Sequence, residues 1–131
     1  MRIHHWEIRD REGFREISAD IDDFRLWYRL PESYAVPASA DPFLAAALLP
    51  AMARGEPLEI DPSLPASPKL LKNLAIYQDI YHSWNPALKI VSIEAVTRPA
   101  ISLNAGVLSF FSGGVDSMFT FLKRREELTH V

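Results

Sequence analysis

The sequence contains no cysteine and no excess of basic residues. The absence of cysteine excludes disulfide bonds, thiolate metal ligands and cysteine nucleophiles within these 131 residues. Lysine and arginine number 14 against 17 aspartates and glutamates, which leaves a net charge of −3. Proteins that bind nucleic acid usually have a basic face, so the charge gives no nucleic-acid signature.

Long apolar runs are also lacking. The longest, residues 43–53, is about half the length that a membrane span needs, and Pro50 interrupts it. The first residues, MRIHHWEIRD, contain no apolar core followed by a cleavage site, which a signal peptide requires. We therefore expect a cytoplasmic protein that does not associate with membranes.

The first hundred residues combine strand and helix patterns. Residues 24–30 alternate apolar and polar side chains, which is typical of a half-buried strand. Asp41-Pro42 and Ser67-Pro68 each place a capping residue before a proline, and they predict helices that end near Gly55 and Asn85. Further strands are expected at residues 2–8, 58–60 and 88–96. These elements predict a small α+β unit.

The remaining residues show a different pattern. Residues 97–106, which include Pro99 and Gly106, form the candidate boundary, so we predict two domains, residues 1–100 and 101–131. Residues 107–111 are nearly all apolar, as in a strand that is buried on both faces. One such strand and one helix cannot cover each other fully. We therefore expect an N-terminal fragment, which a missing C-terminal half or a partner subunit completes.

The segment between that strand and the helix reads SGGVDS, residues 112–117. Gly113 and Gly114 allow the backbone to approach a ligand closely. Amides at the start of a helix attract anions, and the hydroxyls of Ser112 and Ser117 are additional donors. Asp116 fits such a loop if its carboxylate caps the loop amides or holds a magnesium ion. The alternative is a Gly-Gly turn that binds nothing.

SGGVDS resembles the PP-loop of the N-type ATP pyrophosphatases, in the adenine nucleotide alpha-hydrolase-like superfamily. No Gly-Lys-Ser/Thr follows, so the segment is not a Walker loop. FFSGGVDSMFTFLK is most similar to the 7-cyano-7-deazaguanine synthase-like branch, and SPKLLKNLAIYQDIYHSW resembles the N-terminal extension of some of its members. The loop residues that carry the match are Ser112, Gly113, Gly114, Asp116 and Ser117.

The resemblance implies an α/β fold in which residues 101–131 begin a parallel-sheet domain that binds ATP. It implies an ATP-dependent ligase or synthetase that adenylates a carboxylate or carbonyl of a small acceptor, such as a nucleobase, and releases pyrophosphate. The whole loop, Val115 included, would then hold the phosphates with Mg²⁺ at a catalytic Asp116. The sequence differs from dedicated enzymes of this branch in two features. About a hundred residues precede the loop, and the cysteine zinc site of those enzymes is missing.

In a second reading, residues 1–100 are a non-catalytic module that binds a partner or substrate, and the loop is vestigial or only binds an anion. Outside the loop, no residue pattern indicates chemistry. His4 and His5 are neighbours in a predicted strand, so their side chains are expected on opposite faces, unable to chelate together. Asp20, Asp22 and Asp23 are expected in a solvated turn. Aromatic side chains that could stack on a base are more readily explained by core packing: Trp27, Tyr77, Tyr81 and Trp84.

Overall fold

The structure is a computed structural model that describes residues 1–98, 107 and 109–131. The chain divides into two compact units, Met1–Ala100 and Ile101–Val131. Among the described residues, the fold is of mixed α/β type, with one five-stranded mixed sheet and three helices. In the same residues, no helix combines the length and apolar character that crossing a membrane requires.

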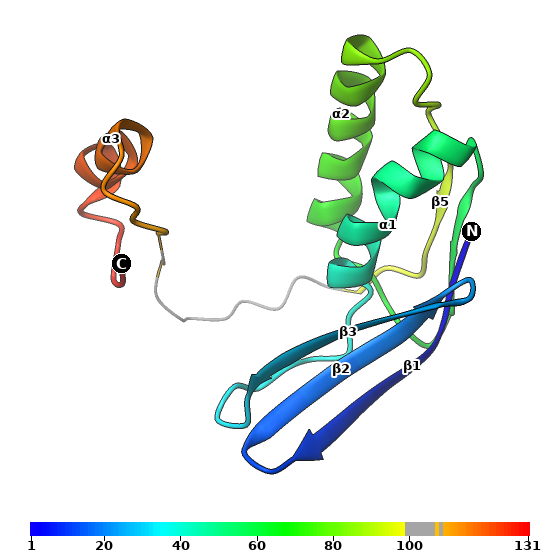
Figure 1. Cartoon of the computed structure of the whole chain (residues 1–131), viewed down its shortest axis with the longest axis horizontal. Coiled ribbons are helices and arrows are strands. Elements are labelled where there is room, and N and C mark those ends of the chain that lie inside the picture. Colours follow the sequence, from blue (N-terminus) through cyan, green and yellow to red (C-terminus); the bar gives the residue numbers. More distant parts are fainter. Residues whose placement is uncertain (99–106, 108) are drawn as a thin grey trace. The chain divides into compact units, whose positions relative to one another are not determined.

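The sheet of the first unit has the strand order β3-β2-β1-β4-β5 (Figure 1). Its strands are β1 (Arg2–Arg11), β2 (Phe14–Ile21), β3 (Phe24–Pro31), β4 (Leu58–Ile60) and β5 (Ile93–Glu94). The first three form an antiparallel meander, whereas β4 pairs in parallel with both β1 and β5. The strand predicted at residues 24–30 is confirmed as β3, and β1 extends three residues beyond its predicted end at residue 8.

The two helices of the first unit begin and end close to the capping residues that the sequence indicates. Helix α2, Pro68–Trp84, begins after Ser67, whose side chain accepts a hydrogen bond from the amide of Leu70 at 3.4 Å. Helix α1, Asp41–Arg54, ends at Gly55, which adopts the left-handed φ of 69° that glycine tolerates best. The expected cap of α1 is wrong in one respect, because the N-cap residue is Ala40. The carboxylate of Asp41 instead accepts a hydrogen bond from the amide of Ser67 at 2.8 Å, which joins the starts of the two helices.

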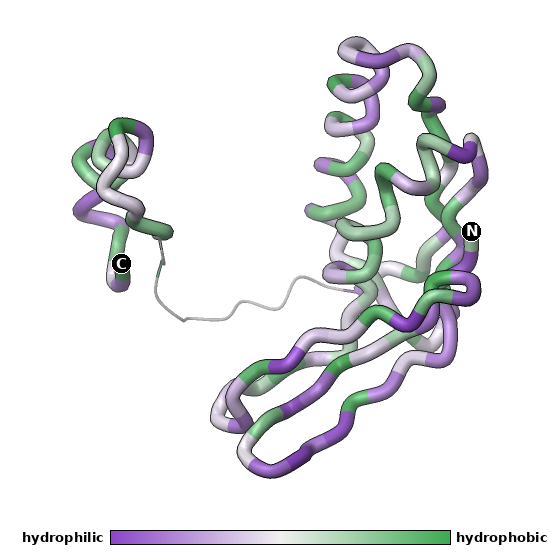
Figure 2. The backbone as a smooth tube through the Cα atoms, in the orientation of Figure 1, coloured by the Kyte–Doolittle hydropathy of each residue, from purple (hydrophilic) through white to green (hydrophobic). Residues whose placement is uncertain are grey.

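The core of the first unit lies between α1 and the sheet. Helix α1 packs against β2, β4 and α2, and it contributes six buried side chains. Figure 2 shows apolar residues along α1 and hydrophilic ones around the turn between β1 and β2. The largest fully buried side chains are those of Ile3, Leu44, Met52, Leu58 and Leu64. All the described residues of this core belong to the first unit.

The predicted strands differ from the structure in three places. Strand β2 is absent from the elements that the sequence predicts, although Ile17, Ala19 and Ile21 follow a period of two. The strand expected at residues 88–96 is reduced to the two residues of β5, because the amides of Lys89 and Val91 bond to Met52 and Gln78 and not to a strand. Residues 107 and 109–111 form no regular strand, and Leu108 lies outside the described residues, as does most of the predicted boundary at residues 97–106.

Candidate functional site

The candidate loop, residues 112–117, leads directly into helix α3, Val115–Arg124. Gly113 has a φ of 76°, a left-handed conformation in which a side chain is strained. Gly114 is the N-cap residue and is extended, with φ −77° and ψ 169°. The chain thus turns at Gly113, and the first amides of α3, which have no acceptor within the helix, lie at the end of the turn.

The two serines of the loop bond within it. The hydroxyl of Ser117 donates to the carbonyl oxygen of Gly114 at 2.9 Å, and the hydroxyl of Ser112 donates to that of Ser117 at 3.3 Å. The amide of Gly114 lies 3.5 Å from the Ser112 hydroxyl. The serine side chains therefore hold the turn in shape, and the donors that remain for an anion are the backbone amides.

Asp116 lies in the first turn of α3 and is exposed. No side chain caps this helix, so the capping role considered for Asp116 is not what the structure shows. Among the described residues, no donor bonds to its carboxylate. A magnesium site commonly takes one or two carboxylates and completes its shell with phosphate oxygens and water, and a single exposed carboxylate beside helix amides fits that donor set.

Backbone hydrogen bonds join the segment before the loop to the segment after α3. The amide of His130 donates to the carbonyl of Val107 at 3.2 Å, and the amide of Ser109 donates to the carbonyl of His130 at 3.2 Å. This alternation is the hydrogen-bond pattern of parallel strands. Phe111 packs edge-on against Phe121 of α3, with ring centroids 5.7 Å apart. These hydrogen bonds place the segment before the loop beside the segment that follows α3.

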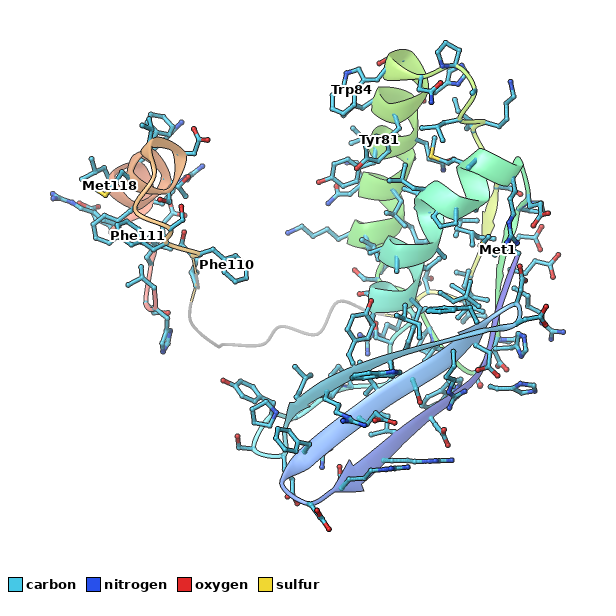
Figure 3. All side chains as sticks on the ribbon, in the orientation of Figure 1. Met1, Tyr81, Trp84, Phe110, Phe111 and Met118 are labelled. Atoms are coloured by element: carbon cyan, nitrogen blue, oxygen red, sulfur yellow. The ribbon has the colours of Figure 1, made fainter. Side chains whose placement is uncertain are left out.

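One face of helix α3 is apolar, and the described residues of the second unit do not cover it. The side chains of Val115, Met118, Phe119 and Leu122 recur at spacings of three and four, and all are exposed. Phe110, labelled in Figure 3, is 92% exposed. Contiguous apolar surface of this kind usually leads proteins to associate.

We therefore expect the chain to self-associate through α3. Replacing both Phe119 and Leu122 by lysine should give a monomer, because two charges would lie on the contact face. Sedimentation velocity over a range of concentrations measures the effect. The control is Ile76→Lys, which changes an exposed apolar residue of α2 and should leave association unaltered. A wild-type chain that sediments as a monomer at every concentration would contradict the expectation.

No known family model, no curated protein and no solved structure matches the chain.

A second polar cluster lies in the first unit, where the sequence predicts none. His4 and His5 do not lie on opposite faces: their Nδ1 atoms are 2.9 Å apart, and His5 Nδ1 is 3.1 Å from Oδ2 of Asp20. The cause is a shift of register in β1 between His4 and Glu7, where His5 adopts a φ of 48°. Asp20 is correspondingly part of β2 and half-buried, not part of a solvated turn.

The aromatic residues of α2 are less buried than core packing predicts. Tyr81 packs partly against the core, but Tyr77 is half-exposed and Trp84 is 75% exposed. Their rings contact one another, because the ring centroid of Tyr81 lies 6.3 Å from that of Tyr77 and 5.9 Å from that of Trp84. Figure 3 labels Tyr81 and Trp84 on α2. Trp27 is also half-exposed, and the guanidinium of Arg29 lies over its ring at 4.7 Å.

Proposed function

We propose that residues 112–117 bind the β- and γ-phosphates of ATP, and that the chain belongs to an ATP-dependent ligase. The proposed reaction joins a carboxylate or carbonyl oxygen of a small acceptor to the α-phosphorus and releases pyrophosphate. The acceptor class proposed is a nucleobase or a similar small molecule, as in the 7-cyano-7-deazaguanine synthase-like branch that the loop sequence resembles.

One observation carries this proposal. The SGGVDS sequence occurs where the chain turns at a left-handed Gly113 and starts a ten-residue helix immediately after Gly114. Backbone amides at such a turn point toward one region, where the helix dipole also favours negative charge. A phosphate placed there would accept hydrogen bonds from the loop amides that the serine hydroxyls do not engage.

The chemistry assigned to the loop is electrostatic. Its amides would stabilise the charge that develops on the leaving pyrophosphate, and their fixed positions avoid the cost of reorienting donors during the reaction. Asp116 would hold Mg²⁺ against the phosphate oxygens, and the ion would supply neutralising charge there. Ser112 and Ser117 would keep the turn in its binding shape through their mutual hydrogen bond.

Binding of pyrophosphate to the chain tests the proposal. Titration followed by ¹H–¹⁵N correlation spectra should shift the amide signals of Gly113, Gly114 and the first turn of α3. Gly114→Ala should weaken binding about tenfold or more, because a methyl group would hinder close approach and displace charge-assisted hydrogen bonds. The substitution itself is tolerated by the fold, since a Cβ at Gly114 would meet only the Ser112 hydroxyl, at 3.5 Å.

The matched control is Thr120→Ala, an exposed change six residues farther along the chain in α3. It should bind pyrophosphate as the wild type does. Equal affinity in Gly114→Ala and the wild type would refute the assignment of the loop. Signal changes confined to residues 1–98 would instead favour a binding module with a vestigial loop.

A further inference from the structure

The cluster of His4, His5 and Asp20 arises from the backbone of β1. His4 pairs directly with Asp20 across the β1–β2 ladder, so these two side chains share one face of the sheet. A regular strand would direct His5 to the other face. The irregular register after His4 and the left-handed φ of His5 bring its ring back beside the other two. Bulges commonly redirect a side chain in this way next to functional sites.

His5 Nδ1 lies within hydrogen-bonding distance of two atoms that can also be metal ligands, His4 Nδ1 and Asp20 Oδ2. In a neutral imidazole this nitrogen carries either a hydrogen or a lone pair. With the hydrogen, it can donate to Asp20 Oδ2 at 3.1 Å, and with the lone pair it can accept from His4 Nδ1 at 2.9 Å. A cation would instead use lone pairs of all three residues at once, since each of them offers a ligand atom to one point.

We propose that His4, His5 and Asp20 bind a divalent transition-metal ion of the zinc class. Zinc is bound by imidazole nitrogen and carboxylate oxygen at about 2.0–2.2 Å, so two ligands of a tetrahedral ion lie about 3.3 Å apart. The observed separations of 2.9 and 3.1 Å are close to that value, and the three ligand atoms all lie within 4.8 Å of one another. Three protein ligands leave a fourth position for water or another ligand.

The surroundings of Asp20 suit a metal ligand. Arg25 donates to Oδ1 of Asp20 at 2.9 Å, which orients the carboxylate with Oδ2 toward the histidines. This hydrogen bond is the main cause that lowers the pKa of Asp20, whereas burial raises the pKa and the hydrogen bond with His5 lowers it further. Arg25 also pairs with Glu7, which offsets the positive charge beside the site. Hydrogen-bonded carboxylates are usual among metal ligands.

The test is a calorimetric titration of the untagged chain with zinc chloride. We expect one equivalent to bind, and we expect cobalt chloride to give the visible absorption of a four- or five-coordinate ion. His5→Asn should weaken zinc binding at least about tenfold, since even changes around the ligands of a metal cost that much. Asparagine tolerates the left-handed backbone of this position, so the bulge is kept. His4→Gln, at a regularly paired position, should give the same loss.

The matched control is His130→Gln, which removes a histidine of the second unit and should leave the affinity unchanged. Zinc should also raise the melting temperature of the wild type and of the control but not of the two ligand variants, because only a protein that binds in the folded state is stabilised. A wild-type chain that binds no zinc would overturn the proposal. So would binding that survives both His4→Gln and His5→Asn.

Discussion

Asp116→Ala is expected to lower the rate of pyrophosphate release from ATP and magnesium about a hundredfold or more in the active enzyme. The carboxylate lies in the first turn of α3, next to the amides proposed to hold the leaving group. Without it, the magnesium ion would lose its protein ligand, and the charge that develops in the transition state would be less well neutralised. The loss should therefore fall mainly on kcat and much less on KM for ATP.

The fold should not be affected by this change. Asp116 is exposed, and its carboxylate accepts no hydrogen bond from the described residues, so only a favourable interaction with the helix dipole is lost. Asp116→Asn removes the negative charge but keeps the size of the side chain. It should lose as much activity as the alanine variant. Asp79→Ala, an exposed carboxylate of α2, is the control and should keep full activity. Release of pyrophosphate by Asp116→Ala at the wild-type rate would remove the basis for the ligase assignment.

Leu44→Ala is expected to destabilise the first unit by about 2–5 kcal/mol. Leu44 of α1 is 0% exposed in the core between α1 and the sheet, so truncation removes buried apolar contacts and leaves a cavity. The control is Leu49→Ala in the same helix, where the side chain is 41% exposed and the change should stay within about 1 kcal/mol. A loss below about 1 kcal/mol for Leu44→Ala would contradict the assignment of α1 to the core.

Tryptophan fluorescence during urea unfolding measures this effect for the first unit alone. All three tryptophans of the chain, Trp6, Trp27 and Trp84, lie within residues 1–98. The signal therefore reports the unfolding of this unit whatever happens to α3. The free energy follows from the linear dependence on urea concentration, and an unchanged slope shows that the two variants unfold the same structure.

The elements that the sequence predicts well are those with local signals. Ser67 and Pro68 mark the start of α2, and Gly55 marks the end of α1, because caps and glycine turns depend on neighbouring residues only. Strand β2 is the exception, since the sequence prediction misses it although Glu12 and Gly13, in the turn that precedes it, have φ angles of 27° and 81°. Positive φ at both positions is typical of a tight hairpin, which glycine after a polar residue favours.

What the sequence does not predict depends on distant partners. The segment predicted as a strand at residues 88–96 bonds elsewhere: the amide of Val91 donates to the buried side chain of Gln78, and that of Lys89 donates to the carbonyl of Met52. No periodicity in the segment contains that information. The position of His5 is equally non-local, because a register shift depends on how β1 aligns with β2.

The candidate loop lies between these two cases. Its residue types and the helix after it are readable from the sequence, because Gly113 and Gly114 act on their own backbone. The hydrogen bond between Ser112 and Ser117 is not readable, since it needs the turn to be closed first. The sequence thus predicts the donors of the loop, and the structure adds what holds them in place.

The parallel pairing of β1 with β4 has a consequence for synthesis on the ribosome. Arg2 and Ile3 pair with Glu59 and Ile60, whereas β1, β2 and β3 are joined by short turns and can pair as soon as they emerge. Until β4 is added, the outer edge of β1 has exposed backbone donors and acceptors beside the buried side chain of Ile3. A nascent chain paused before residue 60 would therefore be most prone to join another nascent chain at this edge.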